Sequence, residues 1–169
     1  MDSNILYINQ DMREMELFGT VRAVVCAFDS INYILSEDDL LKVFRNVNNY
    51  LDPDGLFMFD MNTEYKYREL IGNTTIAENR EDAAFIWDNF YSVDDKLNEY
   101  NLVFFAKEGD LFRRTTETHY QKAYDIEEMK SLINESGLLL ECVFDAYTTE
   151  APTDTSERVL FICKEQGKG

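Results

Sequence analysis

The segment from Val21 to Phe28 restricts the fold of this chain more than any other. Seven of its eight residues are apolar, a composition typical of a strand that is covered on both faces, as in a parallel sheet. A second apolar run, Leu56–Phe59, follows farther along the chain. Parallel strands require a long crossover connection, which is usually a helix. We therefore expect a helix between the two runs.

That helix is expected to begin at Ser36. Ser36 and Asp39 match the pattern of a capping box, in which polar side chains satisfy the free N–H groups of the first turn. Apolar residues then recur at helical spacing as far as Leu51 and predict one buried stripe. The D-P-D-G sequence at 52–55 predicts a turn, because proline cannot continue a helix and glycine accepts positive φ.

In the middle of the chain, the spacing of the apolar residues changes from a helical to a strand-like period. From about residue 74 to residue 124, long aromatic segments are separated by polar stretches at 93–96 and 107–110, a pattern typical of antiparallel hairpins. The rest of the chain predicts a short strand at Ile5–Ile8, and strands over about Leu138–Ala146 and Arg158–Cys163. It also predicts a helix that begins at a capping pair of Asp125 and Glu128 and ends at Gly137, which would occupy the C′ position, where glycine adopts positive φ.

These elements predict an α/β fold with two parts. Residues 1–72 and 125–169 would form a three-layer core built on one sheet. Residues 73–124 would insert an antiparallel β meander that acts as a lid or as a sheet on the substrate side.

Composition limits the classes of partner. With 33 Asp and Glu against 16 Lys and Arg, the formal net charge is −17, which repels nucleic acids and anionic membranes. No segment predicts a membrane span or a secretory leader. The three cysteines, Cys26, Cys142 and Cys163, lack the paired spacing of zinc sites. We expect a cytoplasmic protein with reduced thiols, and neither nucleic acid nor membrane as a partner.

Polar clusters follow the three early strands. They are Asn9–Asp11, Asp29–Tyr33 and Asp60–Asn62. Ligands of open α/β sheets bind outside the carboxyl ends of the strands. One such cluster is usually a cap for the next helix or turn, but three in succession predict a ligand site on this rim.

Several kinds of catalytic site are excluded. His119 is the only histidine, and no G-x-S-x-G, H-E-x-x-H, P-loop or phosphate-binding G-x-G-x-x-G motif is found. The chain therefore lacks the residues needed for serine-nucleophile hydrolysis, for metal-dependent hydrolysis and for nucleotide hydrolysis. We also expect no metal site. His119 lies in an alternating strand pattern, where it is either a surface residue or an active-site base.

Three segments resemble the class I S-adenosylmethionine-dependent methyltransferases, in particular small bacterial members with an antiparallel insertion late in the fold. The segments are Gln10–Arg13, Val24–Ile34 and Leu51–Asn62. Their order and spacing match the ends of the family's third, fourth and fifth strands, and the resemblance extends over nearly the whole chain. It implies a partial Rossmann-like methyltransferase fold, S-adenosylmethionine as the cofactor and a small molecule as the methyl acceptor.

The resemblance also implies roles for individual residues. The Asp11 carboxylate would accept a hydrogen bond from the adenine amino group, and the Met12 backbone would contact the ring. The methionine part of the cofactor would be lined by Cys26, Ala27, Phe28 and Asp29.

The methyl acceptor would lie near Ser30, Asn32 and Tyr33. Two residues of the insertion, Tyr91 and His119, are further candidates for this side of the site. An aromatic stripe of period 2 is also typical of ordinary sheet packing, and no residue is assigned as the base.

One part of the family pattern is not found here. In the family, a Gly-rich loop follows the first strand, and an acid that binds the ribose follows the second. Without those strands, Ile5–Ile8 lacks its neighbour and Val21–Ala27 has an open edge, which favours pairing with other chains. We expect either that Ile5–Ile8 pairs beside Val21–Ala27 or that a second chain supplies a strand, which would make a homodimer.

Three functions remain open. The first is methyl transfer to a small molecule, impaired by the lack of the Gly-rich loop. The second is a non-catalytic methyltransferase remnant that acts as a binding or oligomerisation module. The third is a small-ligand binding domain, with the aromatic meander as the binding part and the α/β part as its scaffold.

Overall fold

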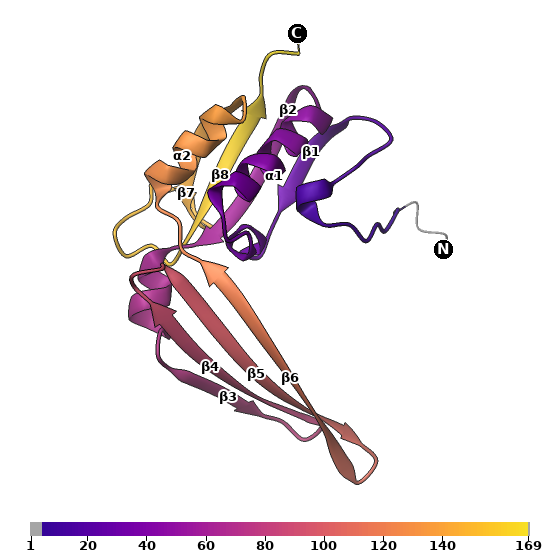
Figure 1. Ribbon diagram of the computed structural model, residues 1–169, viewed down its shortest axis with the longest axis vertical. Coiled ribbons are helices and arrows are strands. Elements are labelled where there is room, and N and C mark those ends of the chain that lie inside the picture. Colours follow the sequence, from indigo (N-terminus) through magenta and orange to yellow (C-terminus); the bar gives the residue numbers. More distant parts are fainter. Residues whose placement is uncertain (1–4, 169) are drawn as a thin grey trace.

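The computed structural model describes residues 5–168, which form two four-stranded sheets (Figure 1). The core sheet has the strand order β1 (Val21–Cys26), β2 (Leu51–Asn62), β8 (Arg158–Glu165) and β7 (Leu138–Asp145). β1 and β2 are parallel, whereas β8 is antiparallel to both of its neighbours. The second sheet is antiparallel throughout and consists of β3 (Thr75–Asn79), β4 (Ala83–Ser92), β5 (Leu97–Glu108) and β6 (Leu111–Lys122). The predicted α/β fold with an antiparallel insertion is confirmed.

Both α-helices begin at the predicted caps. In α1 (Glu37–Tyr50), the Ser36 side chain accepts a hydrogen bond of 3.2 Å from the Asp39 N–H. α2 (Ile126–Glu135) begins with a capping box formed by Asp125 and Glu128. Three short helical turns complete the fold: η1 (Met12–Glu14), η2 (Ser30–Tyr33) and η3 (Lys66–Ile71).

The hydrophobic core lies between the two helices and one face of the core sheet. The Phe44 ring of α1 packs against Phe57 and Phe59 of β2, with centroids 5.8 and 5.3 Å apart. Phe59 stacks on Phe161 of β8 at 4.8 Å. These four rings are completely buried, and their removal from water is the main contribution to the stability of this layer.

The opposite face of the core sheet is apolar and largely open among the described residues. Val25 pairs with Met58, which in turn pairs with Ile162, so their side chains share this face. Val25 is 64% exposed, and Leu56 and Leu139 are 38% and 44% exposed. Residues 5–168 therefore form two of the three expected layers, with the α-helices on one face only.

The predicted strand at Ile5–Ile8 is wrong. This segment has no regular secondary structure and no strand partner among residues 5–168, and its residues are 48–81% exposed. Two hydrogen bonds of 3.1 Å between Gln10 and Glu16 close the following residues into a loop, and η1 then packs on α1. A parallel strand needs a free crossover of about a dozen residues, which this tied loop does not provide. Among the described residues β1 pairs only with β2, so the predicted pairing beside Val21–Ala27 is absent.

The start of β2 also differs from the prediction. Val21 of β1 pairs with Leu51, and Ala23 pairs with Leu56. The expected turn at 52–55 therefore lies within β2 as an irregularity of the pairing, with Asp54 at φ 60°. The D-P-D-G sequence bends the strand there, and the chain pairs with β1 before the turn as well as after it.

Candidate functional site

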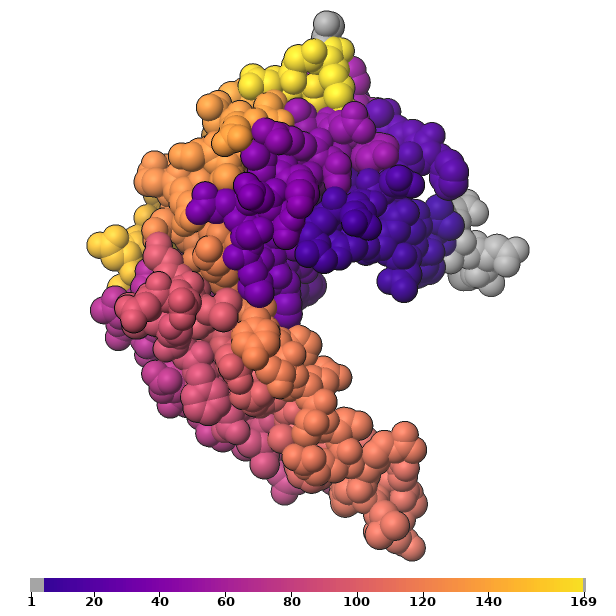
Figure 2. Space-filling model, in the orientation of Figure 1, coloured from indigo at the N-terminus to yellow at the C-terminus, as the bar shows by residue number. Residues whose placement is uncertain are grey.

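The carboxyl ends of β1 and β2 meet the antiparallel insertion, and the molecule is hollowed between the core and the insertion (Figure 2). A cavity of about 310 Å³ lies at this junction. Residues from both sheets and from η2 and η3 line it, among them Asp29, Tyr33, Lys66, Trp87, Tyr100 and Arg158. The rim predicted from the three polar clusters thus contains a cavity, which the clusters after β1 and β2 help to form.

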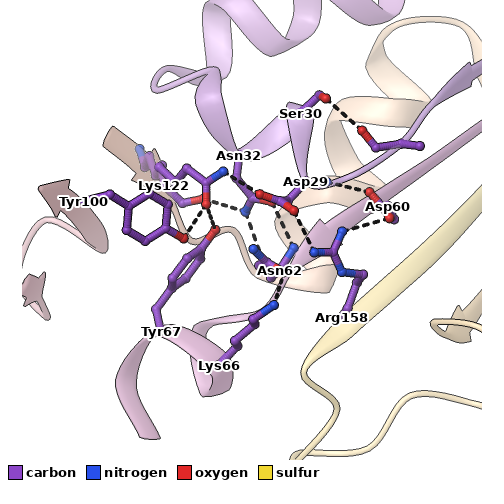
Figure 3. Close-up of polar contacts among 12 residues, drawn as sticks. Asp29, Ser30, Asn32, Asp60, Asn62, Lys66, Tyr67, Tyr100, Lys122 and Arg158 are labelled. Atoms are coloured by element: carbon purple, nitrogen blue, oxygen red, sulfur yellow. Dashed lines mark hydrogen bonds and ion pairs between the residues drawn. The ribbon is translucent and has the colours of Figure 1, made fainter. Parts of the chain in front are cut away.

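The Asp29 carboxylate connects the core sheet to the insertion. Arg158 Nη2 donates to Asp29 Oδ1 at 2.6 Å (Figure 3). Gln121 of β6 donates from Nε2 to Asp29 Oδ2, also at 2.6 Å. Hydrogen bonds to charged groups are about twice as strong as neutral ones. Asp29 therefore fixes the position of β6 relative to β1 and β8.

Asp60 completes an ion-pair network beneath the cavity. Its carboxylate accepts from the Asp29 backbone N–H at 2.7 Å and from Arg158 Nη1 at 2.9 Å (Figure 3). The side chains of Asp60 and Arg158 are only 7% and 15% exposed. One guanidinium thus binds two carboxylates that converge from different strand ends, and the three groups together keep a net negative charge.

The backbone at the end of β1 adopts an uncommon conformation. Phe28 and Asp29 have φ values of 60° and 51°, in the left-handed region that L-residues rarely occupy. Such residues persist where surrounding contacts hold them, and they are frequent at functional sites. Here the contacts of Asp29 with Asp60, Arg158 and Gln121 hold this conformation.

Gln121 also binds two tyrosines, of which Tyr100 lines the cavity. Its Oε1 accepts from the hydroxyl groups of Tyr67 at 2.8 Å and Tyr100 at 2.6 Å. Gln121 is completely buried, so all of its hydrogen bonds serve this site. Burial raises the pKa of both tyrosines above the ordinary value, which keeps the two hydroxyl groups protonated as donors.

Tyr33 connects the cavity to the only histidine. Tyr33 Oη lies 3.3 Å from His119 Nδ1, and His119 Nε2 lies 3.0 Å from Glu117 Oε2. Because a carboxylate accepts hydrogen bonds, the Nε2–H tautomer fits this arrangement and leaves Nδ1 to accept from Tyr33. Burial, and then the charge of Asp29, raise the pKa of Tyr33.

The residues predicted to contact the cofactor lie in two places. Cys26, Ala27 and Phe28 stand at the end of β1, next to Asp29, and Phe28 is 78% exposed. Met12 is the first residue of η1 and Asp11 is its N-cap, and η1 packs on α1. Arg13 donates to both Asp11 oxygens, at 2.9 and 2.6 Å, and this pairing lowers the pKa of Asp11 to about 2.

Three predicted acceptor-side residues are not among the residues that line the cavity, and their contacts are structural. Asn32 is completely buried and bonds to the backbone of Asn62 and Lys122 (Figure 3). Ser30 donates to the Ala27 carbonyl at 2.8 Å. Tyr91 stacks on Tyr67, with ring centroids 6.1 Å apart. Tyr33 and His119 are the predicted acceptor-side residues that the structure brings together in a polar contact.

Sequence reasoning missed four residues of the cavity network: Lys66, Trp87, Gln121 and Arg158. Arg158 reaches the network because β8 runs antiparallel to β2 in a register that pairs Arg158 with Asn62. For all four residues, the sequence contains no local signal that places them together.

Within residues 5–168, no three or more His, Cys, Asp or Glu side chains are grouped so that they could hold a metal ion. No helix in the same range is long and apolar enough to cross a membrane.

Comparison with known proteins identifies relatives along most of the chain. No family model matches it. It is 34% identical over 158 residues to YqeM of Bacillus subtilis (strain 168), a protein provisionally named as a methyltransferase, and the alignment covers 93% of this chain and 64% of YqeM. A similarly named protein of Geobacillus sp. (strain WCH70) is 32% identical over 162 residues, which cover 95% of this chain and 66% of the relative. This chain spans slightly less than two thirds of the length of these relatives.

Solved structures agree with these relationships. An S-adenosylmethionine-dependent methyltransferase from Clostridium acetobutylicum ATCC 824 superimposes with a TM-score of 0.87 at 28% identity, over 94% of this chain and 63% of that one. The CcbJ methyltransferase from Streptomyces caelestis shares the fold, with a TM-score of 0.77 at 15% identity over 94% of this chain and 62% of its own.

The fold and the cavity thus define a Rossmann-like α/β protein with a cavity at its strand ends. The chain belongs to the family of S-adenosylmethionine-dependent methyltransferases, as the resemblance in its sequence predicts.

The residues after β1 fit one side of the family's cofactor. The backbone from Ala27 to Asp29 is accessible, because Ala27 and Phe28 are exposed. Burial raises the pKa of the neighbouring Cys26 thiol to about 11. A protonated thiol is a poor nucleophile, so Cys26 can lie near a methyl donor without becoming methylated. The residues that would hold the cofactor in this chain are Asp11, Met12 and Cys26–Asp29.

Proposed function

We propose that this chain forms the acceptor-binding part of a methyltransferase that acts on a small molecule. The observation that carries the proposal is the cavity at the carboxyl ends of β1 and β2, closed on one side by the insertion. Residues 73–124 would act as the substrate-side sheet, and residues 1–72 and 125–169 as the core. The free thiols of all three cysteines are consistent with a cytoplasmic protein.

S-adenosylmethionine supplies a methyl group activated by a positively charged sulfur. The protein therefore has to align the acceptor with that methyl group and exclude water. Trp87 and Tyr100 contribute apolar wall to the cavity, with ring centroids 5.1 Å apart. The Asp29 network keeps the end of β1 in place next to this wall.

The proton released by the acceptor requires a base, and Tyr33, His119 and Glu117 form a path for it. Tyr33 lines the cavity and donates to His119 Nδ1, which can take a proton as Glu117 stabilises the resulting imidazolium. We propose that His119 receives this proton through Tyr33. The acceptor atom would be an oxygen, a nitrogen or a carbon.

Binding of S-adenosylhomocysteine, measured by calorimetry, tests the proposal. We expect heat of binding that Asp11→Ala weakens at least several-fold, because this carboxylate would face the adenine. Asp110→Ala is the matched control, since Asp110 lies in the distant turn between β5 and β6. No heat from a protein whose circular dichroism shows it to be folded would contradict cofactor binding by this chain.

A second function, a module that binds another chain, is favoured by one observation. β1 pairs with one neighbour among the described residues, and the open sheet face beside it exposes Val25, Leu56 and Leu139. Unpaired strand edges and apolar faces favour association. A homodimer through β1 would give twice the monomer mass in sedimentation, and Val25→Lys would restore the monomer. A monomeric wild type at high concentration would contradict the homodimer.

A further inference from the structure

The cavity contains a cation without a counter-ion. Lys66 Nζ donates to Asn62 Oδ1 at 3.1 Å, and within residues 5–168 it forms no ion pair (Figure 3). Arg158, the other cation that lines the cavity, is already paired with Asp29 and Asp60. Lys66 is therefore the cation of the cavity whose charge is available to a ligand.

A second donor of the same cavity lacks an acceptor. Trp87 Nε1 is buried and has no hydrogen-bond partner in the described part of the chain. Leaving a buried donor unsatisfied costs about 1–3 kcal/mol, so native proteins rarely do so without compensation. An acceptor oxygen of a ligand that reached the indole N–H would satisfy this donor.

Lys66 lacks an ion pair although the protein as a whole is strongly acidic. The chain has a formal net charge of −17, with 33 acidic residues against 16 basic ones, yet none of the acidic residues forms an ion pair with Lys66 in the described range. The acidic side chains near Lys66 either bind Arg158 or lie outside the cavity lining. Arg158 binds Asp29 and Asp60, and Glu157 is exposed outside the cavity lining.

We propose that the cavity binds an anionic oxygen group, a carboxylate or a phosphate, through Lys66 and the Trp87 indole N–H, and that the methyl acceptor carries this group. The assignment of the anion to a methyl acceptor rests on the proposed function. The anion site itself depends only on the cavity, on Lys66, which has no ion-pair partner within residues 5–168, and on the Trp87 N–H, which has no acceptor there.

The single tryptophan of the chain makes the proposal directly measurable. Trp87 has the only indole N–H, so one cross-peak in a ¹H–¹⁵N NMR spectrum reports on the cavity. We would titrate the protein with inorganic phosphate, with acetate and with methylammonium, each at constant ionic strength with chloride as the background anion. We expect phosphate or acetate to shift this cross-peak along a saturating curve, and the stronger of the two identifies the kind of anion.

Two variants test the role of Lys66. Lys66→Gln should raise the apparent Kd for the anion at least tenfold, whereas Lys66→Arg, which keeps the charge, should retain binding. Lys130→Gln is the matched control, because Lys130 is a lysine of α2 whose partner is Glu127. The remaining cross-peaks of each spectrum show whether the variant is folded.

Three results would overturn the anion site. They are the lack of a saturating shift with either anion, an equal shift with methylammonium, and equal binding by Lys66→Gln and Lys130→Gln. The S-adenosylhomocysteine titration separates this inference from the proposed function. Anion binding without cofactor binding would contradict the methyltransferase proposal and leave the anion site, and the reverse result would contradict the anionic acceptor.

Discussion

At the scale of single residues, the site depends on a few charged side chains that meet from distant parts of the sequence. Asp29 and Arg158 are 129 positions apart and form an ion pair of 2.6 Å. The strand-end position of Asp29 is predictable from the sequence, because a buried run ends just before it. Its partner is not, because nothing near Arg158 in the sequence distinguishes an ion-paired arginine from an exposed one.

Removal of the Arg158 side chain should destabilise the protein. Arg158→Met leaves the Asp29 and Asp60 carboxylates without their common partner in a largely buried place, and we expect the free energy of unfolding to fall by about 3 kcal/mol. Urea denaturation measures this change. Arg45→Met is the control, because Arg45 and Glu135 are 57% and 61% exposed and exposed pairs contribute below about 1 kcal/mol. Equal effects of the two substitutions would contradict the role of Arg158.

Anion affinity should depend on pH through Lys66. Burial, and then the charge of Arg158, lower the pKa of Lys66 from its ordinary value of 10.5, while Asp29, Asp60 and Glu157 act in the opposite direction. Only the protonated ammonium attracts an anion, so affinity is full below the lowered pKa and is lost as the pH rises through it. The Trp87 cross-peak measures this loss. Lys66→Arg should keep its affinity over the same range, because arginine stays charged, and a parallel loss in that variant would exclude Lys66 as the titrating group.

At the scale of elements, local patterns predict the helices and hairpins well. The cap at Ser36, the capping box at Asp125 and the positive φ of Gly137 all occur where the sequence predicts them. Ile5–Ile8 shows the limit of such patterns, because an apolar β-branched segment becomes a strand only where a partner edge is within reach.

The junction of the core with the insertion requires a glycine at position 72. A Cβ atom there would lie 2.1 Å from the Tyr67 carbonyl oxygen and 3.2 Å from Tyr91 Cβ. Gly72→Ala should therefore displace η3 or the start of the insertion, and we expect a loss of about 1–3 kcal/mol in the free energy of unfolding. Gly19→Ala is the matched control, because a Cβ at Gly19 meets nothing within 4 Å. Equal stability of the two variants would contradict the prediction, because it would show that the backbone at position 72 can shift to accommodate a Cβ atom without a loss of stability.

At the scale of the whole molecule, the two sheets differ in how well they are buried. The helices cover one face of β2 and β8, whereas the insertion extends away from the core and exposes most of β6 (Figure 1). The two parts are connected through the cavity residues and through the contact of Asn32 with Lys122. The insertion therefore depends on the site for its position.

This difference predicts unequal local stability. Amide hydrogens of β2 and β8 should exchange with the slow rates of global unfolding, whereas those of β5 and β6 near the turn at Gly109 should exchange much faster, because local opening there exposes little apolar surface. Hydrogen exchange followed by mass spectrometry or NMR measures both. Uniform protection along β6 would contradict the predicted difference in local stability and would indicate that the whole insertion unfolds only with the core.

The sequence by itself determined the α/β class, the caps of both helices, the hairpin period of the insertion and the polar ends of the early strands. These properties follow from periodicity and from side-chain chemistry within a few residues. The tertiary structure decided that Ile5–Ile8 stays unpaired, that Asp29 shares Arg158 with Asp60, and that Lys66 and Trp87 line one cavity. Within residues 5–168, Lys66 has no ion-pair partner there and Trp87 Nε1 has no acceptor. Such contacts join residues far apart in the sequence, and which of many polar side chains meet depends on sheet order and register, which no local pattern records.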